Sequence, residues 1–257
     1  MSQARQPRLT VADEPFLIVR SVATGYSSGY WMDEHAHPWH QLLYATSGAM
    51  TVYAARWSWI IPAARAVLIP AGCRHSMRMW GEVAMRSLYF PPRLDSPVLH
   101  HPDCRVLTVT PLLREMILRV ADLGALDSRV PEQARLAGVL LDELHLTPPE
   151  PLALPLPADR RAAAVARDVL ADPGQEPSLD ALARRHAAGR RTLERLFRAE
   201  TGMSFGMWQQ KARLLSSARA LAENRPVTEA ALDAGYSSVS AFIAAFKRTF
   251  GCTPGSL

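Results

Sequence analysis

The sequence of 257 residues predicts two domains: an all-β barrel followed by a pair of helices, and then an all-α domain with two helix-turn-helix units. Three observations predict this division. Short β-rich runs separated by turns fill the first part of the chain, a proline-rich stretch interrupts it, and one helical pattern is written twice near the end. A chain of this length can form two modest domains, each with its own core.

The repeated pattern extends from Ser178 to Gly251. In each copy, small and apolar residues precede a glycine turn, and apolar residues follow it at the spacing of three and four that is typical of a helix. The first copy contains Leu179, Leu182, Ala183, Gly189, Leu193, Phe197 and Gly202, and the second contains Val227, Ala230, Ala231, Gly235, Phe242, Phe246 and Gly251. The offset is 48 residues before the turn and 49 after it, which predicts helix-turn-helix units at about 179–200 and 227–249.

The second helix of the first copy has a strongly basic outer face. If Leu193, Leu196 and Phe197 face the core, the opposite side carries Arg190, Arg191, Glu194, Arg195 and Arg198. Arginine presents a planar fork of donors that fits phosphates and the O6 and N7 atoms of guanine. A charged face is commonly just a solvated surface, but the helix-turn-helix geometry directs this one toward a DNA major groove.

The segment between the copies, residues 205–223, is expected to form one stiff helix. It has no proline and no glycine after Gly206, and its apolar residues, which recur at a helical period, are Trp208, Leu214, Leu215, Ala218 and Leu221. At about 1.5 Å per residue the helix spans about 25 to 30 Å, close to one turn of B-DNA. Two reading helices held at that distance can enter adjacent major grooves on one face of the duplex.

This region resembles the AraC/XylS family of transcription regulators over about the last hundred residues. The residues that carry the resemblance are, in order, Leu182-Ala183, Thr192-Leu193-Glu194-Arg195-Leu196-Phe197, Thr201-Gly202-Met203-Ser204, Arg213-Leu214, Ala234-Gly235-Tyr236, Ser240-Ala241-Phe242, Phe246-Lys247 and Gly251-Cys252-Thr253-Pro254. The resemblance implies a sequence-specific DNA-binding regulator rather than an enzyme, with double-stranded DNA, an effector and RNA polymerase as partners. Activator and repressor both remain open.

Two positions depart from the family pattern. Gly189 stands where the family often has a serine helix cap, a change that costs only a few tenths of a kcal/mol. Ala244 stands where the family usually has an arginine, so strong contacts by the second reading helix are in doubt.

The residues expected to meet DNA lie at the ends of the first helices and on the outer faces of the second ones. We expect Arg184, Arg185 and Arg225 to contact the phosphates of the DNA backbone, and the affinity from these contacts to fall as the salt concentration rises. Base reading is expected from Arg190, Arg191, Glu194 and Arg195. The set is completed by Arg198, Val239, Ser240, Ile243, Ala244, Lys247 and Arg248, of which the apolar members can touch thymine methyl groups.

The net positive charge is concentrated in the helical half. The formal charge is +5, and from Ala158 onward 15 Lys and Arg residues stand against 10 Asp and Glu residues, whereas the numbers before Ala158 are 14 and 14. The helical half is therefore expected to meet a polyanion. Cys73, Cys104 and Cys252 form neither a disulfide framework nor a zinc-finger spacing.

The chain shows no targeting pattern. Its first residues lack the apolar core of a signal peptide, and no apolar run reaches the roughly 18 residues of a membrane span. We therefore expect a cytoplasmic protein without membrane contact.

The front half is rich in short strand patterns. The runs expected to form strands are Phe16–Val22, Gln41–Tyr44, Met50–Tyr53, Ala66–Ile69 and Ala84–Phe90. Turns such as Ser47-Gly48 and Pro70-Ala71-Gly72 separate them, as in a small antiparallel barrel or sandwich.

Two motifs in this half resemble those of cupins. The first is Gly29, five residues, His35-x-His37, three residues, Gln41, six residues and Gly48, with glutamine at the usual glutamate position; the second is Pro70-x-Gly72-x-x-His75. Alternate residues of a strand share a face, so His35 and His37 are expected to point inward, where a partner strand can bring His75 beside them. Three imidazoles and an amide oxygen can hold a divalent transition metal, although a neutral amide holds it more weakly than a carboxylate.

Three uses of this cluster remain open: a metal site, a metal-free pocket for an organic effector, and a purely structural role. AraC-type sensory barrels commonly bind organic effectors without metal, so no cofactor is certain. Trp57 and Trp59 are two residues apart, so on a strand they lie on the same face and can form an aromatic wall of the pocket. Such residues more often pack in the hydrophobic core. The expected effector contacts are His35, His37, Gln41, Trp57, Trp59 and His75, and the metal ligands among them are His35, His37, Gln41 and His75.

Two amphipathic helices follow the barrel. Residues 110–125 carry a stripe of Leu112, Leu113, Met116, Ile117 and Val120, and residues 131–146 carry one of Leu136, Val139, Leu140 and Leu144. The pair can complete the barrel core or meet its counterpart in a second subunit. We favour a homodimer, because repeated half-sites let two weak readers bind together.

A proline-rich linker then leads to the second domain. It contains Pro148, Pro149, Pro151, Pro155 and Pro157, which make it extended and semi-rigid and able to pass an orientation between domains. A helix over residues 159–170, with Ala163, Val165, Ala166 and Val169, opens the second domain. The expected division is a cupin-like effector-binding and dimerisation domain at 1–146, a linker at 147–158 and a DNA-binding domain at 159–257.

The sequence thus predicts a transcription regulator whose barrel binds a small-molecule or metal effector and so changes how the paired helices engage DNA. One rival is a metal-dependent cupin enzyme fused to a DNA-binding domain, against which Gln41 and the basic helical half argue. Another is an architectural DNA-binding protein whose barrel merely dimerises. Stabilisation of the barrel by a ligand would count against that second rival.

Overall fold

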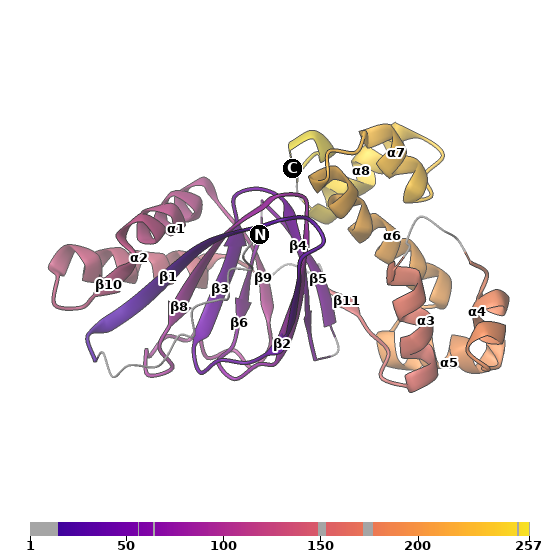
Figure 1. The fold of residues 1–257 in the computed structure, drawn as a ribbon, viewed down its shortest axis with the longest axis horizontal. Helices are drawn as coiled ribbons and strands as arrows, with labels where there is room; N and C mark the ends of the chain where they lie inside the picture. Colours follow the sequence, from indigo (N-terminus) through magenta and orange to yellow (C-terminus); the bar gives the residue numbers. More distant parts are fainter. Residues whose placement is uncertain are drawn as a thin grey trace.

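The computed structural model describes residues 15–55, 57–63, 65–148, 153–171, 177–250 and 252–256. A sheet-rich N-terminal part, with two helices on one side, is followed by an all-helical C-terminal part on its other side (Figure 1). This is the fold class that the sequence predicts. Pro149, Pro151 and Gly251, which the sequence analysis named, lie outside the described residues, as do residues 1–14.

Two antiparallel sheets form the N-terminal part. One has the strand order β10-β1-β8-β3-β6-β9 and the other has the order β11-β5-β4-β7-β2. The strands are β1 Leu17–Tyr26, β2 Trp31–His35, β3 His40–Ala45, β4 Ala49–Ala54, β5 Trp57–Pro62, β6 Arg65–Ile69, β7 His75–Trp80, β8 Val83–Phe90, β9 Arg105–Thr108, β10 Ala125–Asp127 and β11 Leu154–Pro155. All five runs that the sequence analysis proposed are strands, and the structure adds the others.

The side chains between the two sheets form the barrel core. It includes Leu43 and Val67 from the first sheet and Val52, Trp59 and Met77 from the second, all of them buried. Because successive strand residues point to opposite faces, each sheet also has an outer face that must be covered.

Two helices cover the outer face of the first sheet. They are α1 (Pro111–Leu123), which Thr110 caps by accepting a hydrogen bond from the Leu113 N–H, and α2 (Pro131–Leu146). They bury most of their predicted stripes against that sheet. Leu112 and Val139 of these stripes are 52% and 49% exposed, so they do not complete the barrel core. Each is adjacent in sequence to a buried residue, which places it about 100° around the helix from the core.

The helical C-terminal part contains two helix-turn-helix units, as the sequence predicts. Its elements are α3 Arg160–Ala171, α4 Leu179–Arg185, α5 Arg190–Thr201, α6 Phe205–Ala222, α7 Val227–Asp233, α8 Val239–Phe250 and a short 3₁₀ helix, Pro254–Ser256. The units are α4 with α5 and α7 with α8. The single helix α6 connects them, and its 18 residues span about 27 Å.

The linker is bound on both of its sides. β11 pairs antiparallel with β5, with Leu154 opposite Ser58 and Pro155 opposite Trp57; proline is tolerated there because β11 is an edge strand. On the other side, Trp208 Nε1 of α6 donates a buried hydrogen bond of 2.7 Å to the Pro155 carbonyl oxygen. Residues 154 and 155 of the predicted linker are therefore part of the second sheet.

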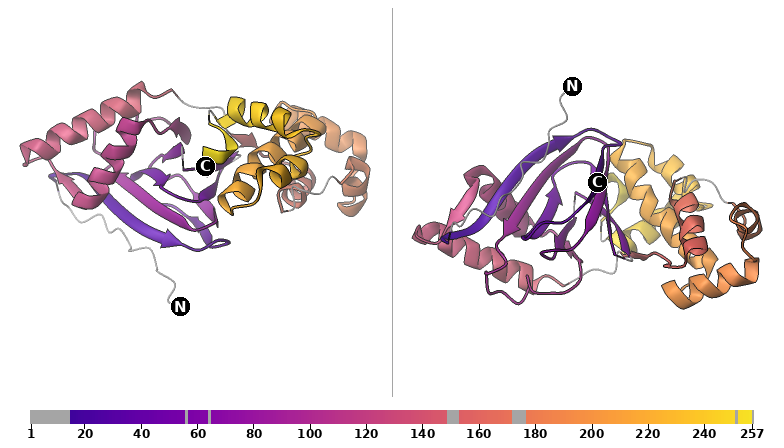
Figure 2. Two further views of the ribbon diagram at one scale, coloured as in Figure 1. Left: turned by 90° about the horizontal axis from the view of Figure 1, so that it is seen from above. Right: turned by 60° about the horizontal axis from the view of Figure 1, so that its bottom comes forward.

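Helix α6 also covers the outer face of the second sheet, opposite α1 and α2 (Figure 2). The contact is close at the end of α6. A Cβ atom at Gly81 would lie 2.3 Å from the Ala222 carbonyl oxygen, so only glycine fits there. Ser28 Oγ donates a hydrogen bond of 2.6 Å to Glu223 Oε1 across the same junction. None of the described helices combines the length and apolar character that crossing a membrane requires.

Candidate DNA interface and ligand pocket

The outer face of α5 is built as the sequence predicts. Leu193, Leu196 and Phe197 are buried, which turns the opposite side to solvent. The five charged residues of that side are all exposed, and they line a shallow depression with a volume of about 730 Å³. They are Arg190, Arg191, Glu194, Arg195 and Arg198. Gly189 begins α5 without a side-chain cap, and Gly202 ends it in the left-handed conformation.

The arginines of this face are not equivalent. Arg190 is held by two carboxylates: its Nη1 lies 2.8 Å from Asp180 Oδ2, and its Nε lies 3.2 Å from Glu194 Oε1. Among the described residues, Arg191, Arg195 and Arg198 form no such ion pair. These three guanidinium groups are therefore the ones able to meet phosphates or base edges without first breaking a bond.

The arginines expected at the DNA backbone lie at the ends of helices. Arg184 and Arg185 are exposed at the C-terminal end of α4, and Arg185 Nη1 lies 2.9 Å from Asp168 Oδ2. Arg225 precedes α7, and its guanidinium contacts Glu229 at 3.1 Å and Asp233 at 2.6 Å. Arg184 is the member of this set with no ion pair among the described residues.

The second reading helix, α8, exposes fewer of its predicted residues. Ser240, Ala244, Lys247 and Arg248 are exposed, but Val239 and Ile243 are half-buried and pack against the core. Contact of Val239 and Ile243 with thymine methyl groups stays a prediction. Both lie along the seam beside Phe242 and Phe246, which the helix turns inward.

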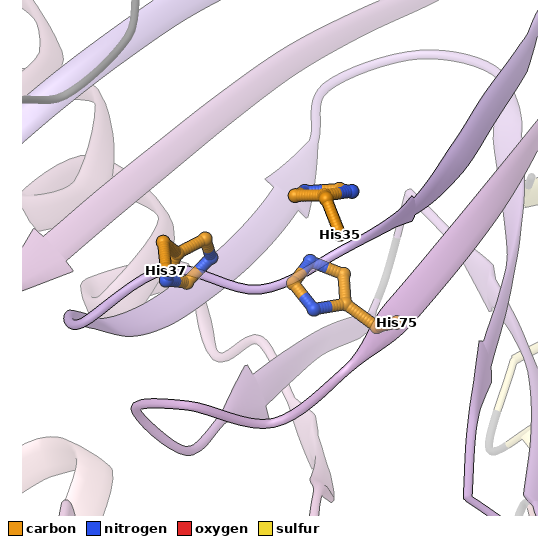
Figure 3. A group of neighbouring side chains, drawn as sticks. All are labelled: His35, His37 and His75. Atoms are coloured by element: carbon orange, nitrogen blue, oxygen red, sulfur yellow. The ribbon is translucent and has the colours of Figure 1, made fainter.

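Three histidines meet at one end of the barrel (Figure 3). The ring centroids of His35 and His75 are 4.3 Å apart, and those of His37 and His75 are 5.2 Å apart. The structure brings them together as predicted, although not for the predicted reason. β2 ends at His35 with an irregular register against β7, so His37 comes from the loop rather than from the same strand.

Backbone carbonyl groups orient all three rings. Nδ1 of His35 lies 2.9 Å from the Asp33 oxygen, Nδ1 of His37 lies 2.8 Å from the Trp39 oxygen, and Nδ1 of His75 lies 2.9 Å from the Cys73 oxygen. A carbonyl oxygen only accepts, so each Nδ1 carries the proton and each Nε2 keeps a lone pair. The same arrangement is common for histidines that bind a metal.

The Nε2 atoms of His35 and His75 are buried and have no hydrogen-bond partner. The three histidines offer ligand atoms that all lie within 4.8 Å of one another. Burial lowers the pKa of His75 to about 4 and also lowers the pKa of His37. At neutral pH these two rings are therefore neutral and able to donate electron pairs.

Gln41 extends the pocket into the barrel. Its Oε1 lies 3.0 Å from His37 Nε2, and its Nε2 donates hydrogen bonds to Ser87 Oγ at 3.0 Å and to the Tyr89 hydroxyl at 3.1 Å. Burial raises the pKa of Tyr89 to about 12, so its hydroxyl stays protonated. Ser87 and Tyr89 were not predicted from the sequence. The alternation of β8 could have placed them on one face, but only the pairing of β8 with β3 sets them beside Gln41.

The two tryptophans have different surroundings. Trp59 is 4% exposed and packs in the barrel core; its role as an effector contact stays a prediction. Trp57 is 38% exposed. It lies in the same cross-strand row as Ala54 and His75 and hence on the same face of the sheet.

Comparison with known proteins agrees with both halves of the structure. Residues 21–146 match the family described as the AraC-like ligand binding domain, and residues 182–257 match a helix-turn-helix domain family. The HTH-type transcriptional regulator NimR of Escherichia coli (strain K12) is 33% identical over 221 residues, which cover 86% of this chain and 80% of NimR. The HTH-type transcriptional regulator RipA of Corynebacterium glutamicum is 35% identical over 102 residues, which cover 40% of this chain and 31% of RipA.

Solved structures give a more distant likeness. ToxT of Vibrio cholerae with a bound unsaturated fatty acid matches 93% of this chain and 94% of its own, with 12% identity and a TM-score of 0.40. The assignment rests instead on the sequence matches, which extend over both parts of the chain. The chain therefore belongs to the AraC family of helix-turn-helix transcriptional regulators, with an AraC-like ligand-binding domain followed by a DNA-binding domain.

Proposed function

We propose that this regulator senses a divalent transition metal bound by His35, His37 and His75. The observation that carries the proposal is the pair of buried Nε2 atoms on His35 and His75 that have no hydrogen-bond partner. An unsatisfied buried polar atom costs about 1 to 3 kcal/mol, and a metal ion would satisfy both. Imidazole nitrogens suit zinc, copper, iron and nickel.

Gln41 supports reversible binding. Its Oε1 and the His37 Nε2 lone pair face each other at 3.0 Å, an arrangement that a nearby cation stabilises. A neutral amide leaves the positive charge of the ion uncompensated, so the ion is held more weakly than by a carboxylate. Weak binding lets occupancy follow the metal concentration, as a sensor requires.

A metal-free pocket for an organic effector is the second candidate. The observation that favours it is the hydrogen-bonded chain from Gln41 to Ser87 and Tyr89, which offers polar groups to a small molecule. Rotation of the Gln41 amide would also let it donate to His37 Nε2. That rotation leaves the Nε2 atoms of His35 and His75 unsatisfied, so we favour the metal.

Metal binding by the full-length protein tests the choice. The protein is stripped with a chelator and titrated with Zn²⁺, Ni²⁺ or Mg²⁺, and bound metal and thermal stability are measured. We expect one transition ion per chain, stabilisation of the fold, and loss of both effects in His75→Gln. The control is His101→Gln, an exposed histidine outside the cluster. Equal binding by His75→Gln and the wild type would contradict the proposal.

For the DNA interface we propose that Arg191, Arg195 and Arg198 of α5 enter the major groove. Their guanidinium groups are exposed and form no ion pair with the residues that the structure describes, which supports this. Glu194 and Arg190 belong to the same face. The DNA backbone would be met by Arg184, Arg185 and Arg225, and the second groove by Ser240, Ala244, Lys247 and Arg248. Residues 159–257 then form the DNA-binding domain, 147–158 the linker and 1–146 the effector-binding domain, acting in the cytoplasm where the DNA lies.

We further propose that α1 and α2 form a homodimer interface. Leu112, Val139 and Leu146 on these helices are 52%, 49% and 73% exposed, and Val139 and Leu146, seven residues apart, share one face of α2 that a second subunit could cover. Sedimentation of Val139→Lys compared with wild type tests this: the variant should become monomeric. A wild-type protein that is monomeric at micromolar concentration would rule the dimer out.

A further inference from the structure

A second cavity, of about 900 Å³, lies between the two parts of the molecule. One wall is the outer face of the second sheet, with Trp31, Tyr53 and Arg78, and the other is formed by α3 and α6. The volume is in the range of small-molecule sites. The cavity is separate from the histidine pocket, because Arg78 and His75 lie on opposite faces of β7.

The cavity has an excess of positive charge. Four arginines line it, namely Arg78, Arg160, Arg167 and Arg219. In the part of the chain that the structure describes, none of the four forms an ion pair with a carboxylate. The carboxylate in the lining, Glu34, is already paired, with its Oε2 2.6 Å from Arg74 Nη2.

Arg219 of α6 is the most constrained of these arginines. It is 7% exposed, its guanidinium lies 4.4 Å from the centre of the Trp80 ring, and its Nη2 donates to Ser216 Oγ at 2.8 Å. Arg78 lies at the same distance from that ring. Burial lowers the pKa of Arg219 and the nearby Arg78 lowers it further, whereas Tyr53 and Glu223 raise it. Burying a guanidinium group is costly, and the contact with a ring offsets only part of that cost.

Apolar and aromatic groups complete the lining. Trp31 is 47% exposed, and its ring centroid lies 5.8 Å from that of Tyr53. Leu156 from the linker and Leu170 from α3 lie on the opposite wall. An aromatic wall facing aliphatic side chains is suited to a flat apolar body, while the arginines are suited to a carboxylate.

We propose that this interdomain cavity binds a planar aromatic carboxylate, with the carboxylate near Arg78 and Arg219 and the ring between Trp31 and Leu170. The site is additional to the proposed metal pocket. Its walls come from both the barrel and the DNA-binding helices, so the ligand stabilises the arrangement of the two parts seen here. DNA affinity and ligand affinity must then change each other by the same factor.

Calorimetric titration of the full-length protein with indole-3-acetate tests the proposal. Tryptophol, which has the same ring and no charge, is the matched probe. A chelator is present throughout, so the outcome does not depend on the proposed metal site. We expect saturable binding of indole-3-acetate, with a Kd at least about tenfold lower than that of tryptophol, as expected for a charge-assisted hydrogen bond.

Variants locate the binding site. Arg78→Gln removes an exposed charge and should weaken indole-3-acetate binding about tenfold, as should Arg219→Gln if that protein folds. Arg135→Gln, on exposed α2 far from the cavity, is the control and should leave binding unchanged. The proposal is overturned if indole-3-acetate does not bind at millimolar concentration, if tryptophol binds equally well, or if Arg78→Gln binds like the wild type.

Discussion

At the scale of single residues, the histidine pocket is prepared by the backbone. Three carbonyl oxygens fix the proton of each ring on Nδ1, and the cluster is buried enough to keep His37 and His75 neutral at pH 7. As a consequence, the stability of the fold depends on pH when no metal ion is bound.

The stability of the chelated protein should therefore fall in mild acid. The folded-state pKa of His75 is about 4, whereas an unfolded histidine titrates near 6.5. Between these values the unfolded chain binds a proton that the folded chain does not, so the free energy of unfolding drops as pH falls, by up to about 3 kcal/mol. Urea unfolding at several pH values measures the drop, and His75→Gln should flatten it. An equally steep drop in His75→Gln would contradict this explanation.

Base reading by α5 can be tested one residue at a time. Arg195→Ala should relax base preference at one position of the binding site and cost about 1 to 3 kcal/mol there. Arg184→Ala, at the end of α4, should instead weaken binding to all sequences alike and reduce its salt dependence. Binding-site selection followed by affinity measurements distinguishes the two; unchanged selectivity in Arg195→Ala would refute its role.

Predictions for single residues succeeded where the helical spacing of apolar residues alone determines which side chains are exposed. The spacing of three and four residues was enough to place Arg191 and Arg195 on the exposed side of α5. It could not show that Arg190 is bound by Asp180, because that contact links two helices. Nor could it show that Trp59 is core, since parity gives the face of a strand but not what fills the space beyond it.

At the scale of elements, the linker is the part that departs most from expectation. Its proline content predicts an extended segment, and residues 154–155 are indeed extended, but they pair with β5 and accept a hydrogen bond from Trp208. Sequence patterns do not reveal such an edge strand, because two residues have no period and the partners lie far along the chain.

The buried hydrogen bond between Trp208 and the linker should have a measurable effect. Trp208→Phe keeps the aromatic packing but leaves the Pro155 carbonyl oxygen without its donor, which should destabilise the fold by about 1 to 3 kcal/mol. Trp57→Phe is the control, because Trp57 is partly exposed on β5 and its side chain forms no hydrogen bond with the described residues. Urea unfolding of the two variants measures the difference; equal stabilities would mean that the bond contributes nothing.

Two of the strands that were not predicted from the sequence, β2 and β7, have a similar composition. β2 and β7 contain methionine, histidine and charged residues in place of the β-branched residues that favour strands. Their structure is decided by pairing within the sheet, with β7 held between β4 and β2. These same two strands carry His35 and His75. The sequence motifs therefore predicted the histidine cluster, although they did not predict the strands that hold it.

At the scale of the whole molecule, the barrel is covered on both outer faces. Helices α1 and α2 cover the first sheet and α6 covers the second (Figure 1). Since α6 also joins the two helix-turn-helix units, the helix that sets their separation rests directly on the sensory barrel. A change in the barrel can thus reach the DNA-binding helices through one packed interface rather than through the linker alone.

The most direct test of this account is a hydroxyl-radical footprint of the full-length protein on a selected binding site. Two reading helices held by α6 should protect two stretches of the duplex about ten base pairs apart, on the same face. Adding about five base pairs between them should remove protection of one stretch, because it rotates that groove to the opposite face. A single protected stretch, or protection unaffected by the insertion, would contradict the central claim that α6 sets two readers one helical turn apart.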